Sequence, residues 1–134
     1  MFGIAPIPIL AYLGFKLGNT TPADIYIKLR EKPWSRTSSN PKLVFTLIKP
    51  RSKDRAKDVA LSIAISGTTS RSEIEKHLDK GVLVYEIKLK NSQIDQIESI
   101  EDLEAFRKIY RETIDKIREL HGKRCRIHVF GAMP

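Results

Sequence analysis

The hydrophobic pattern of the chain changes its period several times. Residues 23–31 alternate apolar and polar side chains, which predicts a strand with one buried face. Residues 59–66 are apolar or small throughout, as is typical of a strand buried on both faces of a central sheet. Further apolar runs predict strands over 42–50, 82–90 and 125–130.

Three other segments carry apolar residues at helical spacing. The longest is 97–122, where Ser99 is suited to cap the first turn and Gly122 to end the last. Residues 7–17 form a wide apolar stripe, with Pro6 or Pro8 in the first turn. Residues 67–78 start with glycine and hydroxyl residues and then become helical.

Strands that alternate with helices predict an α/β fold, with a Rossmann-like (CARF-like) sheet and flanking helices. A length of 134 residues is that of one domain, so residues 1–134 are expected to form a single unit. The FGI at 2–4 is expected to end a strand before the first helix. Residues 32–41 are expected to form a polar loop, and residues 51–57 a basic surface turn.

The chain has a formal net charge of +8, and 30% of its residues are charged. A positive field of this kind favours anionic partners, such as a nucleic acid, a nucleotide or an acidic membrane surface. It does not distinguish among them, and a merely solvated basic face is the alternative. The apolar N-terminal stretch is too short to span a bilayer and lacks the basic start of a secretion signal, so no membrane span is expected.

Cys125 is the one cysteine, which excludes a disulfide within the chain and a zinc site of four cysteines. A reducing, cytoplasmic compartment fits this usage. The neighbours Lys123, Arg124 and Arg126 can lower the pKa of the thiol. The position of Cys125 at the start of an apolar strand favours a packing role instead.

The sequence contains no recognisable catalytic set. His77, His121 and His128 are far apart and lack the spacing of a metal or catalytic motif, so each is expected to be a structural histidine. Glu101 and Asp102 are expected on a solvated helix face. No catalytic activity, metal or cofactor is therefore predicted.

Three junctions share one design, in which an apolar strand meets small residues before a helix start. They are FGIAPIP at 2–8, AISGTTSRS at 64–72, and the closing VFGAMP. In open α/β sheets, ligands bind outside the carboxyl ends of the strands, and helix N-termini attract anions. The second junction is not a P-loop, and it could simply cap a helix. Its residues suited to a phosphate are Ser66, Gly67, Thr68, Thr69 and Arg71.

A tryptophan stands among cations after the 23–31 strand. Trp34 lies between Arg30 and Arg36, and this combination suits base stacking beside a neutralised phosphate. The alternative is a tryptophan folded back as an apolar plug.

In their order, these features resemble the SAVED domain. The stretch FGIAPIPILAYLGFKLGNTTPADIYIKLREKPWSR is similar to its Ala-Pro-x-Pro opening, its apolar helix, and its strand with a nearby Arg and Trp. The segments VALSIAISG, VLVYEIKLK, FRKIYRETIDKIRELHG and IHVFGAMP follow in the order of the family. The resemblance covers essentially all 134 residues.

SAVED domains are similar to two fused CARF-like halves of Rossmann type. The resemblance implies that the chain binds a cyclic oligonucleotide second messenger in bacterial antiphage systems of the CBASS or CRISPR kind. It also implies an associated effector of nuclease, protease or TIR type, which is activated when ligand binding drives self-association.

The resemblance places ligand contacts on the three junctions. It also places contacts, with a looser match to the family, on basic and aromatic residues near the end of the 23–31 strand. The junctions contribute Ala5, Pro6, Pro8, Ser66, Gly67, Thr68, Phe130, Ala132, Met133 and Pro134. The looser match adds Arg30, Trp34 and Arg36. Because the family continues past its HVFxAxP motif, we expect a fold incomplete at the C-terminus, a fragment of a longer domain or effector fusion that a complementing chain completes.

Two other functions stay open at this point. One is a nucleotide-processing enzyme, such as a ring nuclease that uses the same pocket, although it needs a general base or metal set that the sequence does not display. The other is a basic RNA- or DNA-binding module that uses residues 49–57 and Trp34.

Overall fold

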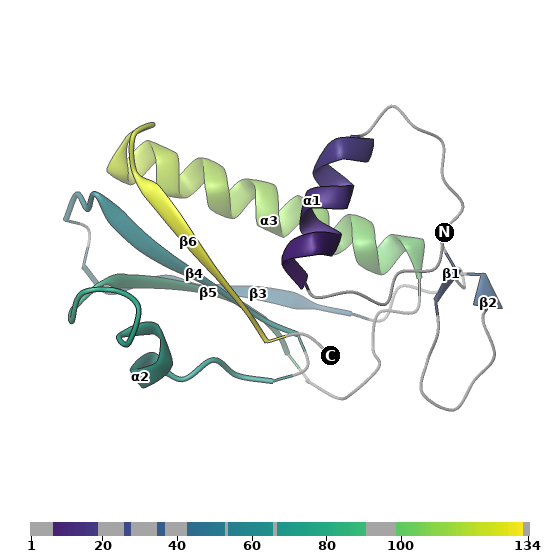
Figure 1. Cartoon of the computed structure of the whole chain (residues 1–134), viewed down its shortest axis with the longest axis horizontal. Helices are drawn as coiled ribbons and strands as arrows, with labels where there is room; N and C mark the ends of the chain where they lie inside the picture. Colours follow the sequence, from purple (N-terminus) through teal and green to yellow (C-terminus); the bar gives the residue numbers. More distant parts are fainter. Residues whose placement is uncertain are drawn as a thin grey trace.

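The structure of the chain is a computed structural model, and it shows a mixed α/β fold (Figure 1). It describes residues 7–18, 26–27, 35–36, 43–52, 54–65, 67–90 and 99–132. The described elements are α1 (Ile7–Leu17), β1 (Tyr26–Ile27), β2 (Ser35–Arg36), β3 (Phe45–Ile48), β4 (Asp58–Ala64), α2 (Arg71–Ile74), β5 (Leu83–Leu89), α3 (Ile100–His121) and β6 (Arg126–Ala132).

The main sheet has the strand order β3-β5-β4-β6. β4 runs parallel to both β5 and β6, whereas β3 pairs antiparallel with β5. Every residue of β4 after Asp58 is buried. This confirms that the apolar run at 59–66 belongs to a central strand, as its lack of polar side chains predicts.

The two crossovers in this sheet move in opposite directions. β4 leads through α2 to β5, and β5 leads through α3 past β4 to β6. Because parallel crossovers are right-handed, helices that accompany opposite movements must lie on opposite faces. Figure 1 shows α3 on one side of the sheet and α2 on the other. This arrangement confirms the predicted Rossmann-like fold class.

The core lies between the sheet and α3. Alternate residues of β4 and β5 face the helix, because successive side chains of a strand point to opposite faces. At the edge of the core, the rings of Phe45 in β3 and Phe106 in α3 have centroids 5.6 Å apart. The buried cluster consists of Val59, Leu61, Ile63, Ile65, Tyr85, Ile87, Leu89 and Ile117.

The ends of α3 are set by its capping residues. The hydroxyl of Ser99 accepts a hydrogen bond from the amide of Asp102 at 3.0 Å. The last turn stops at Gly122, whose φ of 90° is one that glycine tolerates best. Both residues have the roles that the sequence predicts.

The buried His121 at the end of α3 is a structural histidine, as expected. The amide of Ala56 donates to its Nδ1 at 3.2 Å, so the neutral ring carries its proton on Nε2. This nitrogen donates to the hydroxyl of Tyr85 at 2.8 Å. The ring thereby joins α3, β5 and the segment before β4.

The expectation for one acidic side chain is wrong, whereas the packing role favoured for Cys125 is confirmed. Asp102 does not lie on a solvated face; it is buried, and its carboxylate accepts a hydrogen bond from the amide of Leu43 at 3.2 Å. The cations near Cys125 do not lower the pKa of its thiol. Burial raises that pKa, which leaves Cys125 as a packing residue against the core.

Two predicted boundaries also differ from the structure. Within residues 67–78, the helix begins at Arg71 after a capping box of Ser70 and Glu73, and α2 ends at Ile74 rather than near residue 78. The polar loop expected over 32–41 contains β2, which pairs antiparallel with β1. Of the strand predicted over 23–31, only Tyr26 and Ile27 are described, and the FGI at 2–4 lies outside the described residues.

Candidate ligand-binding edge of the sheet

The carboxyl ends of β4, β5 and β6 lie side by side. In the pairing register, Ala64 at the end of β4 faces Lys88 of β5 on one side and Ala132 of β6 on the other. The last residues of β4 and β6 therefore lie next to one another. Ala64 belongs to the second junction of the sequence and Ala132 to the third, so the fold brings parts of both junctions to one edge.

The topology marks one point within this edge. β4 is followed by α2 on one face of the sheet, and β5 is followed by α3 on the other face. Where neighbouring parallel strands send their connections to opposite faces, the departing segments separate, and ligands bind between them. In the described sheet this point lies between the carboxyl ends of β4 and β5.

The residues near this point combine small side chains with cations. Ala64 offers little side-chain bulk, and Gly67 offers none, so a ligand can approach the backbone closely. Lys88 and Lys90 are exposed at the end of β5. Thr68 is exposed, which leaves its hydroxyl accessible at the same edge.

Lys88 is a candidate that sequence reasoning missed. The alternation in residues 84–89 was sufficient to place Lys88 on the face opposite Tyr85, Ile87 and Leu89. Its place beside Ala64 depends on strand order, which no local pattern encodes.

The start of α2 offers less to an anion than the sequence predicts. The hydroxyl of Ser70 accepts from the amide of Glu73 at 3.2 Å, and the carboxylate of Glu73 accepts from the amide of Ser70 at 3.1 Å. The carboxylate of Glu73 thus already occupies the helix start, where an anion would bind. A phosphate near Gly67–Thr69 would bind to the extended segment before the helix.

Arg71 is engaged within its own helix. Its Nε donates to Oε1 of Glu75 at 2.8 Å, and this bond lowers the pKa of the Glu75 carboxyl. The side chain of Arg71 is still 62% exposed. A phosphate contact by Arg71 would therefore share its guanidinium with Glu75.

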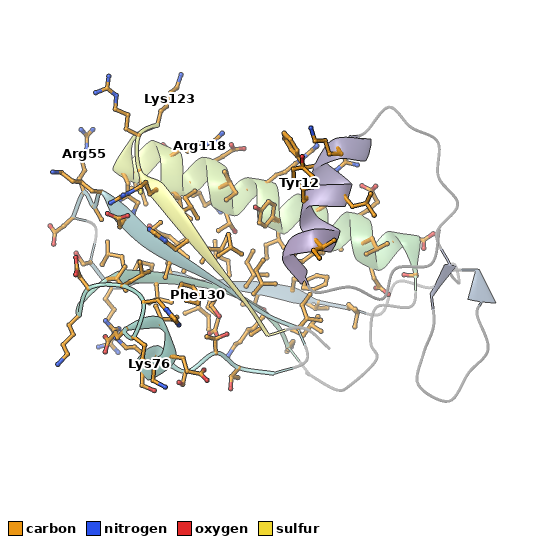
Figure 2. The ribbon with its side chains drawn as sticks, viewed as in Figure 1. Tyr12, Arg55, Lys76, Arg118, Lys123 and Phe130 are labelled. Atoms are coloured by element: carbon orange, nitrogen blue, oxygen red, sulfur yellow. The ribbon has the colours of Figure 1, made fainter. Side chains whose placement is uncertain are left out.

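The ring of Phe130 lies on the face of the sheet opposite α3 (Figure 2). Its centroid is 6.4 Å from that of His77, which follows α2. Pro8 lies in the first turn of α1, and Arg36 lies in β2. The other predicted contacts lie outside the described residues: Ala5, Pro6, Arg30, Trp34, Ser66, Met133 and Pro134.

The described part of the chain shows no metal centre. Among these residues, no group of three or more His, Cys, Asp or Glu side chains could hold a metal ion. None of the described helices has the length and the apolar composition needed to cross a membrane. The fold defines a Rossmann-like α/β domain, and the carboxyl ends of its parallel strands are the edge at which domains of this class bind ligands.

Comparison with known families identifies this domain. The sequence model of the SAVED family, described as the SMODS-associated and fused to various effectors sensor domain, matches residues 1–134. The chain therefore belongs to the SAVED family, and it is a cyclic-oligonucleotide sensing module of effector systems. No curated protein matches the chain.

Proposed function

We propose that the chain binds a cyclic oligonucleotide in the crevice between the carboxyl ends of β4 and β5. The observation that supports this proposal is the opposed departure of the chain from these two strands in a SAVED sensor domain. Cations and small residues line the same edge, as a ligand made of linked phosphates requires.

Each part of the crevice has a role in this proposal. The amides and hydroxyls of Gly67–Thr69 hydrogen-bond the phosphate oxygens, and Lys88 neutralises their charge. Thr69 is half-buried, and its partly enclosed hydroxyl favours an ordered contact over a freely solvated one. The remaining contacts are those that the resemblance to the family assigns. They complete the pocket and come from Ala5, Pro6, Pro8, Ser66, Phe130, Met133 and Pro134.

The remaining cationic and aromatic candidates have more peripheral roles. Trp34 stacks on a base, and Arg30, Arg36 and Arg71 assist the phosphates. Ligand binding drives self-association in the cytoplasm and activates a nuclease, protease or TIR effector in antiphage defence of the CBASS or CRISPR kind. This last step requires that the ligand bind the associated form more tightly than the free form.

Titration calorimetry with cyclic di-, tri- and tetranucleotides tests the binding step. We expect one member of this panel to bind at micromolar concentration or below, and Lys88→Gln to weaken it about tenfold, the size of one lost charge-assisted hydrogen bond. Lys108→Gln is the matched control, because Lys108 is an exposed lysine on α3. Failure of the folded protein to bind any member would contradict the proposal.

The same samples separate a sensor from a ring nuclease. A sensor returns its ligand intact after long incubation, whereas an enzyme returns opened or shortened products. Measuring the bound ligand by chromatography distinguishes the two.

A further inference from the structure

A cavity lies at the opposite end of the sheet, where the parallel strands begin. Its volume is about 490 Å³, and its walls are the first residues of β4 and β6 and the segment 77–82, which returns from α2 to β5. A seven-residue strand such as β4 is about 20 Å long, so the cavity is about that far from the crevice between β4 and β5. The two places share no described residue.

An ion-pair cluster forms one wall of this cavity. Asp58 and Arg126 face one another in the register of β4 and β6. The guanidinium of Arg126 donates from Nε to Oδ1 and from Nη2 to Oδ2, each at 2.8 Å. His128, two residues further along the same face, lies with its Nε2 2.8 Å from Oδ1 of Asp58.

This cluster orients a guanidinium that keeps hydrogen-bonding capacity. A guanidinium has five N–H donors, and Asp58 takes two of them. The others find no partner among the described residues, and the side chain of Arg126 is 75% exposed. Because Asp58 accepts both bonds at once, Arg126 is held in one orientation before any ligand arrives.

The rest of the cavity is rich in positive and imidazole side chains. Lys57 and Lys80 line it, as do His77 and His128. The carboxylates on its walls belong to Asp58, which is already paired, and Asp79. An anion entering the cavity therefore meets more cationic charge than anionic charge.

The positive charge continues outside the cavity at this end of the molecule. Figure 2 shows Arg55, Arg118 and Lys123 projecting near the end of α3 and the beginning of β6. Lys123 and Arg124, in the turn that leads to β6, are both exposed. These side chains add exposed cations beside the cavity.

We propose that this amino-end cavity is a second binding site, which takes a nucleotide phosphate on the oriented guanidinium of Arg126. Its volume is that of a pocket for a nucleotide-sized ligand. Leu78 and Val82 provide apolar wall for a base or sugar, while Lys57 and Lys80 add charge. The phosphate can belong to a free nucleotide or to a single-stranded nucleic acid that extends over the exposed cations.

Fluorescence anisotropy with a labelled single-stranded RNA about ten nucleotides long tests this site on the full chain, with AMP as competitor. We expect Arg126→Gln to weaken binding about tenfold. Lys57→Gln provides an independent second variant, and circular dichroism verifies the fold of each. Arg111→Gln is the matched control, because Arg111 is an exposed arginine on α3 and its substitution removes the same charge.

The outcomes separate specific from diffuse binding. If AMP displaces the RNA when AMP saturates the site, the site takes a free nucleotide. If the RNA binds and AMP does not, the site takes a single-stranded nucleic acid. Equal loss in Arg126→Gln and Arg111→Gln, or no binding of either ligand at about 1 mM, would overturn the site. Because Lys88→Gln should leave this binding unchanged, and Arg126→Gln should leave cyclic-oligonucleotide binding unchanged, either site can fail without the other.

Discussion

Two buried serines in this fold should respond to the same substitution in opposite directions. Ser62, in the middle of β4, is 1% exposed, and no described group hydrogen-bonds its hydroxyl. Ser99 is 0% exposed, but its hydroxyl accepts from the amide of Asp102 at 3.0 Å. The substitution Ser→Ala removes the same atom at both positions and therefore tests the hydrogen bonds rather than the volume.

The expected magnitudes follow from the state of each hydroxyl. A buried hydroxyl without a partner costs about 1–3 kcal/mol, and a small loss of packing offsets part of the gain from removing it. We therefore expect Ser62→Ala to raise the free energy of unfolding by about 1 kcal/mol. Loss of an N-cap costs about 1 kcal/mol, so Ser99→Ala should lower the free energy of unfolding by that amount.

Urea unfolding followed by circular dichroism measures the difference. With a urea dependence of about 2 kcal/mol per M for a small domain, a separation of about 2 kcal/mol moves the two midpoints about 1 M apart. The wild-type midpoint should lie between them. If Ser62→Ala unfolds at a lower urea concentration than the wild type, the hydroxyl has a stabilising partner and the reasoning fails.

Three further predictions concern ionisable groups. The hydrogen bonds from Arg126 lower the pKa of Asp58, so the ionised carboxylate stabilises the fold above about pH 4, and this contribution is lost as the pH falls through the folded pKa. The urea midpoint of Asp58→Asn should therefore fall less at acid pH than that of the wild type. An equal fall in both proteins would contradict the pairing. Burial raises the pKa of Cys125, so at pH 8 iodoacetamide should alkylate the native thiol several-fold more slowly than the urea-unfolded thiol, whereas equal rates would place the thiol in solvent. Tyr85→Phe leaves the buried Nε2 of His121 without its partner and should cost about 1–3 kcal/mol in the same unfolding assay, and a loss below about 0.5 kcal/mol would show that water replaces the hydroxyl.

The sheet and its long helix could be predicted because their cores depend on local periodicity. The run at 59–66 has no polar side chain larger than serine, and such a segment can only be stable with both faces covered. Asp102 shows where residue type misled. Its position, four residues before the core-facing Phe106, placed it on the buried stripe of α3, but a carboxylate was expected in solvent.

The candidate site depended on information that the sequence does not show locally. Ser70 and Glu73 fit the spacing of a capping box, so the late start of α2 could have been predicted from that signature. The role of Lys88 could not, because it follows from β5 lying between β3 and β4. Strand order is decided by the packing of the whole sheet, which couples residues far apart in sequence.

The positions of the charges carry information that the net charge alone does not. Parallel strands have two chemically different ends: connections diverge at the carboxyl ends, whereas at the amino ends the chain returns from its crossovers. Lys88 lies at the first kind of end, beside small residues, and Arg126 lies at the second, fixed by Asp58. A charge of +8 alone is compatible with either location, but the two ends present different shapes to an anion. Because the lining residues of one end are absent from the other, the affinity of each ligand should respond only to substitutions at its own end.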